Sequence, residues 1–295
     1  MKGSEKVLLL VLNFIAQPIL KSLFITGLLI TLATPAIADG HNIKITGEIK
    51  QGGLVVGKTN ANNTVKLNGK TLAVSATGDY VFGFGRDDSS DYNLVISQAN
   101  GKEQRRVITP AKRQYQEQSI TGIAKSIMQP SAKAIARSNK DSGQIRAARK
   151  ISSQLSSFST GFIAPIDGVI TGVYGSRRIF NGVKKRPHFG LDYAGKIGDP
   201  VKSPAAGKIL LYVPDMFYSG GTMIIDHGQG VTSTFLHLSN SYVQVGDQVN
   251  QGQIVAAVGN SGRVTGPHLD WRINWFGIKI DPALALNIKA ISNER

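Results

Sequence analysis

A histidine and an aspartate stand four residues apart in the segment RPHFGLD, residues 186–192. Pro187 precedes His188, and Gly190 separates His188 from Asp192, so the run contains two residues that disfavour a helix. An imidazole and a carboxylate at this spacing can bind a divalent metal ion or exchange a proton with a substrate. We therefore take this segment as the first part of a candidate site.

Two later segments add further site-forming side chains. His237 lies in FLHLS, and His268 lies in TGPHLDW, where Asp270 follows two residues later. Because residues i and i+2 of a strand point to the same face, His268 and Asp270 are expected on one face, with Leu269 buried on the other. A zinc-type site takes three histidine or carboxylate ligands from any part of a chain and leaves one position open for water. The candidate metal ligands are His188, Asp192 and Asp270.

The β-rich region that contains these residues begins at Phe162. Short apolar runs alternate there with glycine-rich turns, as in GDPVKSPAAGKILLYV and VQVGDQVNQGQIVAAVG. Glycine at this density inside strand patterns indicates tight corners and close approaches of the backbone. Residues 161–295 are therefore predicted to form a compact, folded-over β-structure with little helix.

Residues 39–111 are expected to form a separate small domain. Short alternating runs such as IKITGEIK and DYVFGFG are broken by turn residues, among them Asn68-Gly69 and Ala99-Asn100-Gly101. This pattern predicts hairpins in a small antiparallel β-sandwich. The segment contains no cluster of metal-binding or nucleophilic residues, and we interpret it as an accessory domain.

Residues 112–160 differ in composition, since glutamine, serine, lysine and arginine dominate there. Pro130-Ser131 is a typical helix start signal, and apolar residues follow at near-helical spacing. The segment is therefore predicted to be a helical connector whose lysines and arginines lie in solvent. The apolar positions are Ile145, Ala148, Ile151, Leu155 and Phe158.

Residues 164–282 resemble the lysostaphin/LytM-type zinc metallopeptidases, a family that cuts peptidoglycan cross-bridges. The resemblance rests on the H-x-x-x-D pair His188 and Asp192, on His237-Leu238, on the run VGNSGRVTGPH, and on S-P-A-x-G at residues 203–207. The order and spacing of these motifs are specific to the family. The chain is thus expected to be mainly β, with a small antiparallel β-sandwich, a helical connector and a LytM-type folded-over β-sheet peptidase domain.

The resemblance implies roles for individual residues. His188 and Asp192 match metal ligands of the family, and His237 and His268 match its two catalytic histidines. The last motif of the family is H-x-H with a metal-binding second histidine, and Asp270 occupies that position here. The implied cofactor is one zinc ion, although a second carboxylate tilts the site slightly towards Mn²⁺ or Fe²⁺.

Asp270 in place of a histidine has a geometric and an electronic consequence. An aspartate oxygen lies about as far from Cβ as the Nδ1 atom of histidine, so the ligand shell can close without movement of the strand. Two carboxylates on a dication leave the site formally neutral, which should raise the pKa of a bound water. The sequence therefore predicts a slower enzyme, or one that prefers a higher pH.

Four other residues lie near the motifs. Phe217 and Tyr218, in DMFYSGG, are expected at the rim of a substrate groove, where they would contact the substrate. His227, in IIDHGQG, is expected in a turn between two strands and not as a ligand. Trp271 directly follows Asp270, so its side chain is expected to point away from the metal and into the core.

The first 38 residues are interpreted as a signal peptide. A basic start precedes an apolar stretch that ends at Ala36-Ile37-Ala38, an A-x-A cleavage pattern. An uncleaved membrane anchor is the alternative, although Gln17, Pro18 and Lys21 split the stretch into two runs that are short for a membrane helix. Export to the periplasm or cell envelope is predicted, with membrane contact only through an uncleaved leader.

Composition narrows the range of partners. The chain of 295 residues has no cysteine, which excludes disulfides and thiolate metal ligands, and its formal net charge is +15. The predicted leader has three lysines and one glutamate, a net charge of +2, which leaves +13 on the mature chain. Such a surface favours polyanions. For an exported chain without an aromatic-basic cluster, we expect an anionic cell-wall polymer and no nucleic acid.

The sequence thus predicts an exported zinc metallo-endopeptidase that hydrolyses peptide cross-links of peptidoglycan with a metal-activated water. The alternative is a non-catalytic LytM-type protein that binds the wall or activates another cell-wall hydrolase, because Asp270 departs from the family motif. A biotinyl- or lipoyl-type carrier domain is disfavoured. Such a carrier displays a lysine at a hairpin tip, and no lysine lies between Lys208 and Lys279.

Overall fold

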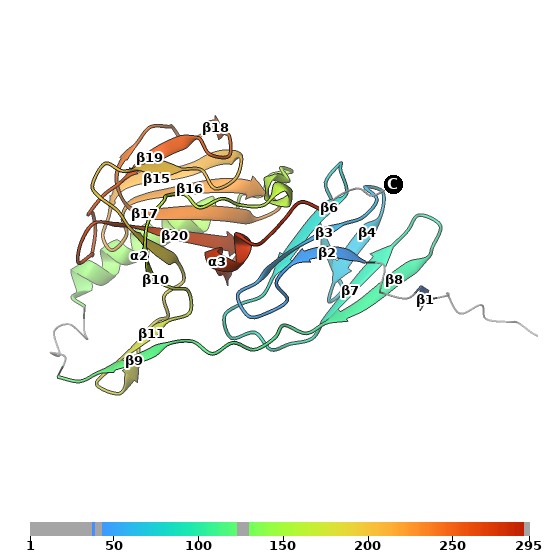
Figure 1. Cartoon of the computed structure of the whole chain (residues 1–295), viewed down its shortest axis with the longest axis horizontal. Helices are drawn as coiled ribbons and strands as arrows, with labels where there is room; N and C mark the ends of the chain where they lie inside the picture. The colour runs from blue at the N-terminus through green and yellow to red at the C-terminus, as the bar shows by residue number, and fades with distance from the viewer. Residues whose placement is uncertain (1–36, 39–42, 123–129, 292–295) are drawn as a thin grey trace, which may run out of the picture. The chain divides into compact units, whose positions relative to one another are not determined.

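The computed structural model describes residues 37–38, 43–122 and 130–291 (Figure 1). Within these ranges the chain is mainly β, as the sequence predicts. Of the predicted leader, only Ile37–Ala38 belongs to the described residues. No helix in the described ranges combines the length and the apolar character needed to cross a membrane. The described helices are α2 (Ala132–Ala148), the 3-10 helix η2 (Ser157–Thr160) and α3 (Pro282–Ala285).

Two sheets form the N-terminal part of the described chain. One has the strand order β2-β3-β6 and the other has the order β1-β8-β7-β4-β5. Alternating apolar residues from both sheets, such as Phe82 and Leu94, are fully buried in one shared core. The strands are β1 (Ile37–Ala38), β2 (Lys44–Gly47), β3 (Leu54–Lys58), β4 (Thr64–Leu67), β5 (Lys70–Leu72), β6 (Asp79–Gly83), β7 (Tyr92–Ser97) and β8 (Glu103–Ile108).

The hairpin turns of this part fall where the sequence predicts them. Asn68 and Gly69 join β4 to β5 with φ angles of 48° and 77°, and two consecutive positive φ angles are typical of a type I′ turn. The turn between β7 and β8 contains Gly101, also at positive φ. One pairing reaches outside the predicted sandwich, because β1, which belongs to the predicted leader, pairs in parallel with β8, with Ile37 opposite Glu103.

A ten-stranded sheet forms the C-terminal part (Figure 1). Its main path has the order β10-β13-β20-β17-β16-β15-β18, β19 pairs with both β14 and β17, and β21 pairs with β20. This is the folded-over sheet that the glycine-rich sequence predicts. The strands are β10 (Ile170–Gly172), β13 (Leu191–Ala194), β14 (Pro200–Lys202), β15 (Gly207–Met216), β16 (Gly220–Gly228), β17 (Val231–Ser241), β18 (Gln248–Val249), β19 (Ile254–Val258), β20 (His268–Trp275) and β21 (Ile278–Ile280).

The central strands of this sheet are covered on both faces. Every residue of β16 is buried, and so are Phe235 of β17 and Leu269 of β20. In a strand that is covered on both faces, successive residues are all buried, whereas buried and exposed residues alternate in a strand with one open face. Trp271 lies in the same core, as predicted, and its indole nitrogen donates a hydrogen bond to Ser233 Oγ at 3.2 Å.

The connector between the two parts contains a strand as well as a helix. β9 (Glu117–Ile120) pairs in parallel with β11 (Arg177–Phe180), and β11 also pairs with β12 (Val183–Lys184). α2 begins directly after Ser131, whose Oγ accepts a hydrogen bond from the backbone N–H of Ala134 at 3.2 Å. This N-cap confirms the start signal read from Pro130-Ser131.

The predicted helical spacing is wrong beyond Ala148, where α2 ends. Residues 150–156 run as irregular chain against the β16–β17 hairpin, and the backbone N–H of Gln229 donates to the carbonyl of Ser153 at 3.0 Å. Phe158 then enters the C-terminal core from η2 and is fully buried. The apolar positions of this segment therefore reflect docking onto the sheet and not one continuous helical face.

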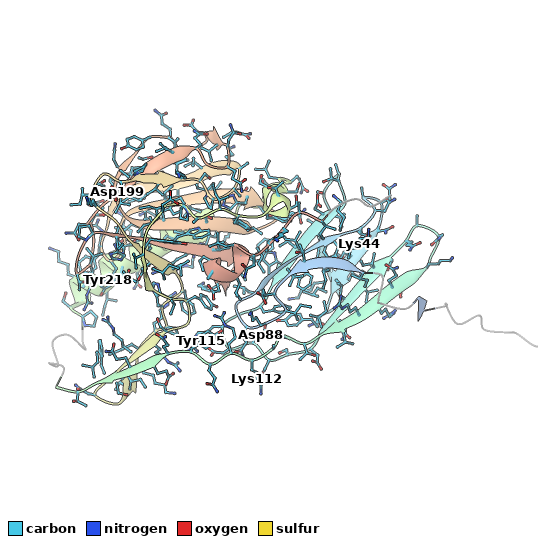
Figure 2. All side chains as sticks on the ribbon, viewed as in Figure 1. Lys44, Asp88, Lys112, Tyr115, Asp199 and Tyr218 are labelled. Carbon is cyan, nitrogen blue, oxygen red and sulfur yellow. The ribbon has the colours of Figure 1, made fainter. Side chains whose placement is uncertain are left out.

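Polar contacts join the sandwich to the C-terminal sheet. Arg113 Nη1 and Asp281 Oδ2 lie 2.8 Å apart, and Arg86 Nε donates to the carbonyl of Gly175 at 2.9 Å. Tyr115 lies on the segment that leads from the sandwich to β9 (Figure 2), and the Arg86 guanidinium stands 4.2 Å from the centroid of its ring. These contacts hold the start of the connector against Asp281 and against the turn that contains Gly175.

His227 lies inside β16, which corrects its predicted place in a turn. Its ring is fully buried, and Nδ1 donates to the carbonyl of Ala206 at 2.8 Å while Nε2 accepts from Ser233 Oγ at 2.9 Å. We assign the tautomer in this way because a carbonyl oxygen only accepts. Burial lowers the pKa of His227 to about 4. Both ring nitrogens are engaged, so His227 is not a free metal ligand.

The buried His227 predicts a loss of stability in acid. Because its folded pKa of about 4 lies below the ordinary value of 6.5, the unfolded chain binds the extra proton between these pH values. Its contribution is complete above pH 6.5 and is lost as the pH falls, by about 2 kcal/mol at pH 5. Urea unfolding at pH 7 and pH 5 should show that His227→Gln loses about 2 kcal/mol less than the wild type over this interval. Equal losses in the two proteins would contradict this assignment.

Gly228 makes the close contact between the β16–β17 hairpin and the connector. Its φ is 99°, and a Cβ atom there would lie 1.7 Å from the carbonyl oxygen of Leu155. Gly228→Ala should therefore lower the free energy of unfolding by about 3 kcal/mol or more, because backbone must move. Gly69→Ala is the matched control, since Gly69 has a φ of 77° but open space around it, and should cost only about 1 kcal/mol. Similar shifts in the melting temperatures of the two variants would show that the contact is unimportant.

Candidate metal centre

Backbone pairing sets the positions of the candidate ligands. The amide and the carbonyl of His188 are both hydrogen-bonded at 2.8 Å to the turn at residues 175–176. Asp192 lies in β13 and is paired directly with Asp270 of β20. Gly172 of β10 faces Asp192, where a Cβ atom would come within 2.2 Å of the carboxylate. Three separate segments thus bring their side chains to one point.

The three candidate ligands converge as the sequence predicts. One donor atom each from His188, Asp192 and Asp270 lies within 4.8 Å of the other two. His188 Nε2 and Asp192 Oδ1 are 3.2 Å apart, are buried, and make no well-aligned hydrogen bond with the described residues. Buried polar atoms without partners are rare, so two of them beside a third donor fit a bound cation. One imidazole and two carboxylates form a ligand set that zinc accepts.

Arg272 holds the third candidate ligand. Its Nε lies 2.9 Å and 3.1 Å from the two carboxylate oxygens of Asp270, and its Nη2 lies 2.5 Å from Oδ2. The two side chains share a face of β20 because the residues are two positions apart. A carboxylate offers about four lone-pair sites, so Asp270 can accept from the guanidinium and still bind a metal. Arg272 therefore orients Asp270 without excluding it from a metal site.

Arg272 was not among the site residues predicted from the sequence. The signal was available, because Arg272 follows Asp270 by two residues, just as Asp270 follows His268, and should therefore lie on the same face of the strand. Burial alone would raise the pKa of Asp270, but Arg272 outweighs burial and lowers it, so the carboxyl group is ionised. Burial likewise opposes the charged form of His188, and the two aspartates overcome it and raise the pKa of His188. The guanidinium offsets the second carboxylate. The expectation of a neutral centre with a less acidic water did not take this guanidinium into account, and it stays a prediction.

His237 has an unusual backbone conformation in β17. Its φ is 65°, and close to it the register of β17 shifts against β16 and against β19. Positive φ in a bulky residue costs on the order of 1–3 kcal/mol and is concentrated at functional sites. Nδ1 donates to the carbonyl of Ser261 at 2.9 Å, which leaves Nε2 as the acceptor. Burial lowers the pKa of His237, so its ring is neutral at pH 7.

His268 begins β20 and stands beside His237. The two ring centroids are 4.8 Å apart, with 47° between the ring planes. His268 Nδ1 donates to the carbonyl of Gly266 at 2.9 Å, so Nε2 is the acceptor in its neutral form as well. Two imidazoles with accepting Nε2 atoms next to a cation site can take up and return a proton.

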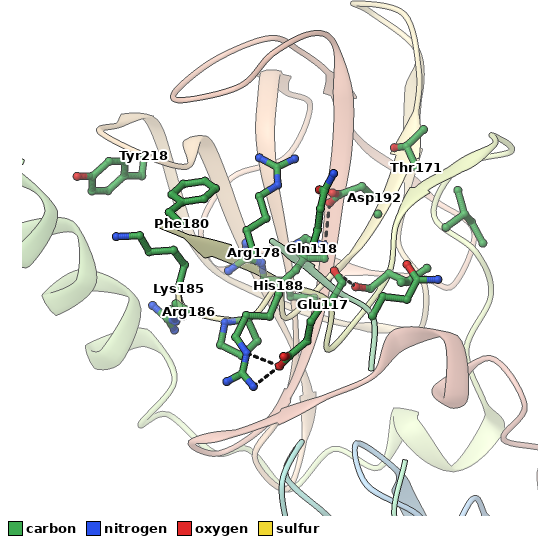
Figure 3. A pocket seen from close by; sticks show the side chains of 18 of the residues that line it. Glu117, Gln118, Thr171, Arg178, Phe180, Lys185, Arg186, His188, Asp192 and Tyr218 are labelled. Atoms are coloured by element: carbon green, nitrogen blue, oxygen red, sulfur yellow. Dashed lines mark hydrogen bonds and ion pairs between the residues drawn. The ribbon is translucent and has the colours of Figure 1, made fainter. Parts of the chain in front are cut away.

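A cavity of about 1070 Å³ opens beside two of the candidate metal ligands (Figure 3). His188, Asp192 and Arg272 line it, and so does Tyr218 from the turn between β15 and β16. Phe217 is 43 % exposed and packs edge-on against Tyr218, with ring centroids 4.8 Å apart. Tyr218 therefore borders the space beside the metal centre directly, and Phe217 supports it from the solvent side.

The connector supplies one wall of the cavity. Glu117 and Gln118 of β9 and Ser138 of α2 line it together with residues of β10 and β11. Asp141 of α2 accepts a hydrogen bond from the backbone N–H of Phe217 at 2.8 Å, which fixes the helix to the β15–β16 turn. The connector thus limits the space that a ligand of the metal centre can occupy.

Comparison with known proteins places these residues in one family. The family model described as Peptidase family M23 matches residues 186–282. A Vibrio cholerae protein named Peptidoglycan DD-endopeptidase ShyA is 34 % identical over 132 residues, which cover 44 % of this chain and 30 % of the relative. Peptidoglycan DD-endopeptidase ShyB of the same organism is 39 % identical over 87 residues, 30 % of this chain and 20 % of that protein. The similarity therefore spans less than a third of each curated relative.

One solved structure matches more of the chain than the family model does. A crystal structure from Pseudomonas aeruginosa, described as a "putative peptidase M23", has a TM-score of 0.63 and 27 % identity. The match covers 82 % of this chain and 96 % of that one. All five histidines and aspartates of the candidate site fall within residues 186–282. This chain therefore contains a peptidase family M23 domain.

Proposed function

We propose that this protein is a metal-dependent endopeptidase that hydrolyses peptide cross-links of peptidoglycan. The observation that carries the proposal is the convergence of three metal-binding side chains, two of which line a cavity, while the ring of His237, paired with that of His268, interacts with the third, Asp270. Metal-dependent hydrolysis of a peptide uses these parts, namely a cation site, groups that transfer protons, and room for a peptide. Relatives named peptidoglycan DD-endopeptidases support this choice of substrate.

His188, Asp192 and Asp270 are the proposed ligands, and zinc suits this set better than manganese or iron. When bound, the ion would act as a Lewis acid towards a water molecule and the scissile carbonyl group. Arg272 keeps the Asp270 carboxylate in place through its paired hydrogen bonds. Its positive charge also keeps the centre electron-withdrawing despite the second carboxylate.

His237 and His268 are the proposed proton-transfer residues. Their Nδ1 protons are held by backbone carbonyls, so either Nε2 can accept a proton from the attacking water. The ring that becomes protonated can then return this proton to the nitrogen of the leaving amine. Its positive charge meanwhile stabilises the negative charge that develops on the carbonyl oxygen.

We also propose that the protein is exported and acts in the periplasm or cell envelope. Residues 1–38 would be the signal peptide, residues 39–111 an accessory domain, and residues 112–160 the connector. The formal net charge of +13 that remains after removal of the leader, +15 less +2, suits a protein that works on an anionic cell wall. Tyr218 and, beside it, Phe217 would contact the substrate, because Tyr218 lines the cavity.

A second candidate function is a non-catalytic role in binding the wall or activating another hydrolase. The observation that favours it is the buried Asp270–Arg272 ion pair, in which the guanidinium supplies the positive charge that a metal ion would otherwise provide. The orientation of His237 and His268 favours catalysis instead, since both rings keep an accepting Nε2 beside the centre. Metal content and activity separate the two functions.

Metal content tests the proposed ligand set. The purified protein should hold one zinc ion per chain after dialysis, measured by elemental mass spectrometry. Asp192→Ala and Asp270→Ala should each weaken zinc binding by about 100-fold or more, because each removes a charged ligand. Asp167→Asn is the control, since this carboxylate is 94 % exposed and pairs only with Lys202. Unchanged zinc binding in Asp270→Ala would remove this residue from the ligand set.

Release of soluble muropeptides from purified sacculi tests the reaction. The wild-type protein should release them, and either a chelator or His268→Ala should slow the release by about 100-fold or more. His268→Ala should keep its zinc, and Asp167→Asn should be fully active. Product masses would identify the bond that is cut. A folded, zinc-loaded protein that binds sacculi but releases nothing would instead establish the non-catalytic function.

A further inference from the structure

We propose that four basic side chains beside the metal centre bind a carboxylate group of the substrate peptide. These side chains, which we call the cationic cluster, are Arg149, Arg186, Arg272 and Lys279. This inference rests on the proposed peptidase function, since it names a substrate group that the same site recognises.

Strand pairing places the cationic cluster in line with the metal centre. Arg272 follows Asp270 on one face of β20, and Thr234 of β17 is paired directly with Arg272. Lys279 of β21 is paired with Asn274, the next residue on that face. Two residues of a strand advance about 7 Å. The cluster therefore extends from about 7 Å to about 14 Å beyond Asp270 along the strand.

Arg149 reaches this face from the C-terminal end of α2. Its Nη2 donates a hydrogen bond to Thr234 Oγ1 at 2.8 Å, across 85 residues of sequence. Its Nε is buried and has no hydrogen-bond partner among the described residues, and the same holds for Oγ1 of Thr232, two positions before Thr234. An unpaired buried polar group costs about 1–3 kcal/mol. Two such groups at one place, one of them cationic, point to a ligand with acceptor oxygens.

The cluster carries more positive charge than its described neighbours neutralise. Arg272 is the one member that contacts a described carboxylate, that of Asp270, which is also a proposed metal ligand. Arg186 lies over the ring of Phe189, 5.5 Å from its centroid, and makes no ion pair with a described residue. A bound metal ion would draw on the Asp270 carboxylate as well, so the need for a further anion would increase.

The electrostatics of the other two members agree with this geometry. Lys279 Nζ donates only to the carbonyl of Gly277, at 2.9 Å, which supplies no negative charge. Burial, followed by repulsion from Arg149, Arg186 and Arg272, lowers the pKa of Lys279 to about 8. Burial and neighbouring arginines lower the pKa of Arg149 to about 10. A carboxylate among these groups would relieve their mutual repulsion.

The position of the cluster favours an anion that belongs to the substrate. Arg186 and Arg272 line the cavity beside His188, and Figure 3 shows Arg186 at its edge. An anion held there shares the space that a peptide at the metal centre must enter. Guanidinium groups match the two oxygens of a carboxylate. An extended peptide advances about 3.3–3.6 Å per residue, so the carboxylate would lie within about four residues of the scissile bond.

The test uses one synthetic stem peptide and a series in which each carboxylate is replaced in turn by a carboxamide. With the zinc-loaded full-length protein, one of these replacements should lower kcat/KM at least tenfold, mainly through KM, because a charged hydrogen-bonded pair is lost. In Arg149→Gln and in Lys279→Gln, the ratio of kcat/KM between acid and amide peptides should fall towards one. Arg149→Lys, which keeps the charge, should retain part of the ratio.

Two controls separate recognition from a general loss of structure. Arg146→Gln removes an exposed arginine from the last turn of the same helix and should behave as the wild type. Thermal melting checks that each variant is folded. If Arg149→Gln does not fold, Lys279→Gln and Arg149→Lys still decide the question.

Calorimetric binding of the same peptides to His268→Ala makes the result independent of turnover. If no peptide is cleaved but the acid form binds more tightly, and Arg149→Gln in the His268→Ala background abolishes this difference, the anion site stands and the peptidase function falls. Equal binding of acid and amide peptides, or a preference that survives Arg149→Gln and Lys279→Gln, would overturn the proposal. Competition by inorganic phosphate without any carboxylate preference would assign the cluster to phosphate and overturn it as well.

Discussion

The side chains of Asp192 and Asp270 face each other across β13 and β20, and the site depends on positive charge at that point. Two carboxylates that share a site repel each other when both are ionised, and a cation between or beside them offsets this repulsion. His188 Nε2 lies 3.2 Å from Asp192 Oδ1, and Arg272 forms an ion pair with Asp270 on the same strand. A metal ion among the three donor atoms would complete this compensation. Because Asp270 is buried, its charge would strongly destabilise the fold if no cation compensated it.

Asp270 and Arg272 are best understood as a unit. A carboxylate alone in place of a neutral imidazole would lower the charge of the centre, and the guanidinium two residues later restores it. The paired hydrogen bonds also give the carboxylate a defined direction, which a ligand needs. The same guanidinium joins Arg149, Arg186 and Lys279 on the side that leads away from the metal centre. Arg272 thus belongs both to the candidate metal centre and to the proposed anion site.

The connector contributes side chains to the candidate site and does not merely link two domains. β9 pairs with β11 and supplies Glu117 and Gln118 to the cavity. α2 is fastened to the β15–β16 turn by Asp141, and its last residues bring Arg149 to the face of β17. These contacts shape the cavity from outside the range of the family model, residues 186–282. The cavity beside the candidate metal centre is therefore formed in part by segments that the family model does not include.

The mainly β fold, the hairpin at Asn68-Gly69, the start of α2 and the core position of Trp271 could all be predicted from the sequence. Each of these follows from local chemistry, because turn residues, capping residues and the alternation of strand faces act over a few positions. The convergence of His188, Asp192 and Asp270 followed from motif order. Four features depend on contacts between distant segments and could not be predicted in this way. They are the strand β9, the end of α2, the burial of His227, and the contact of Arg149 with Thr234 across 85 residues. Arg272 was predictable in one respect and not in another. Its face was readable from its spacing to Asp270, but its ion pair and its place among three other cations exist only because β17, β21 and α2 meet there.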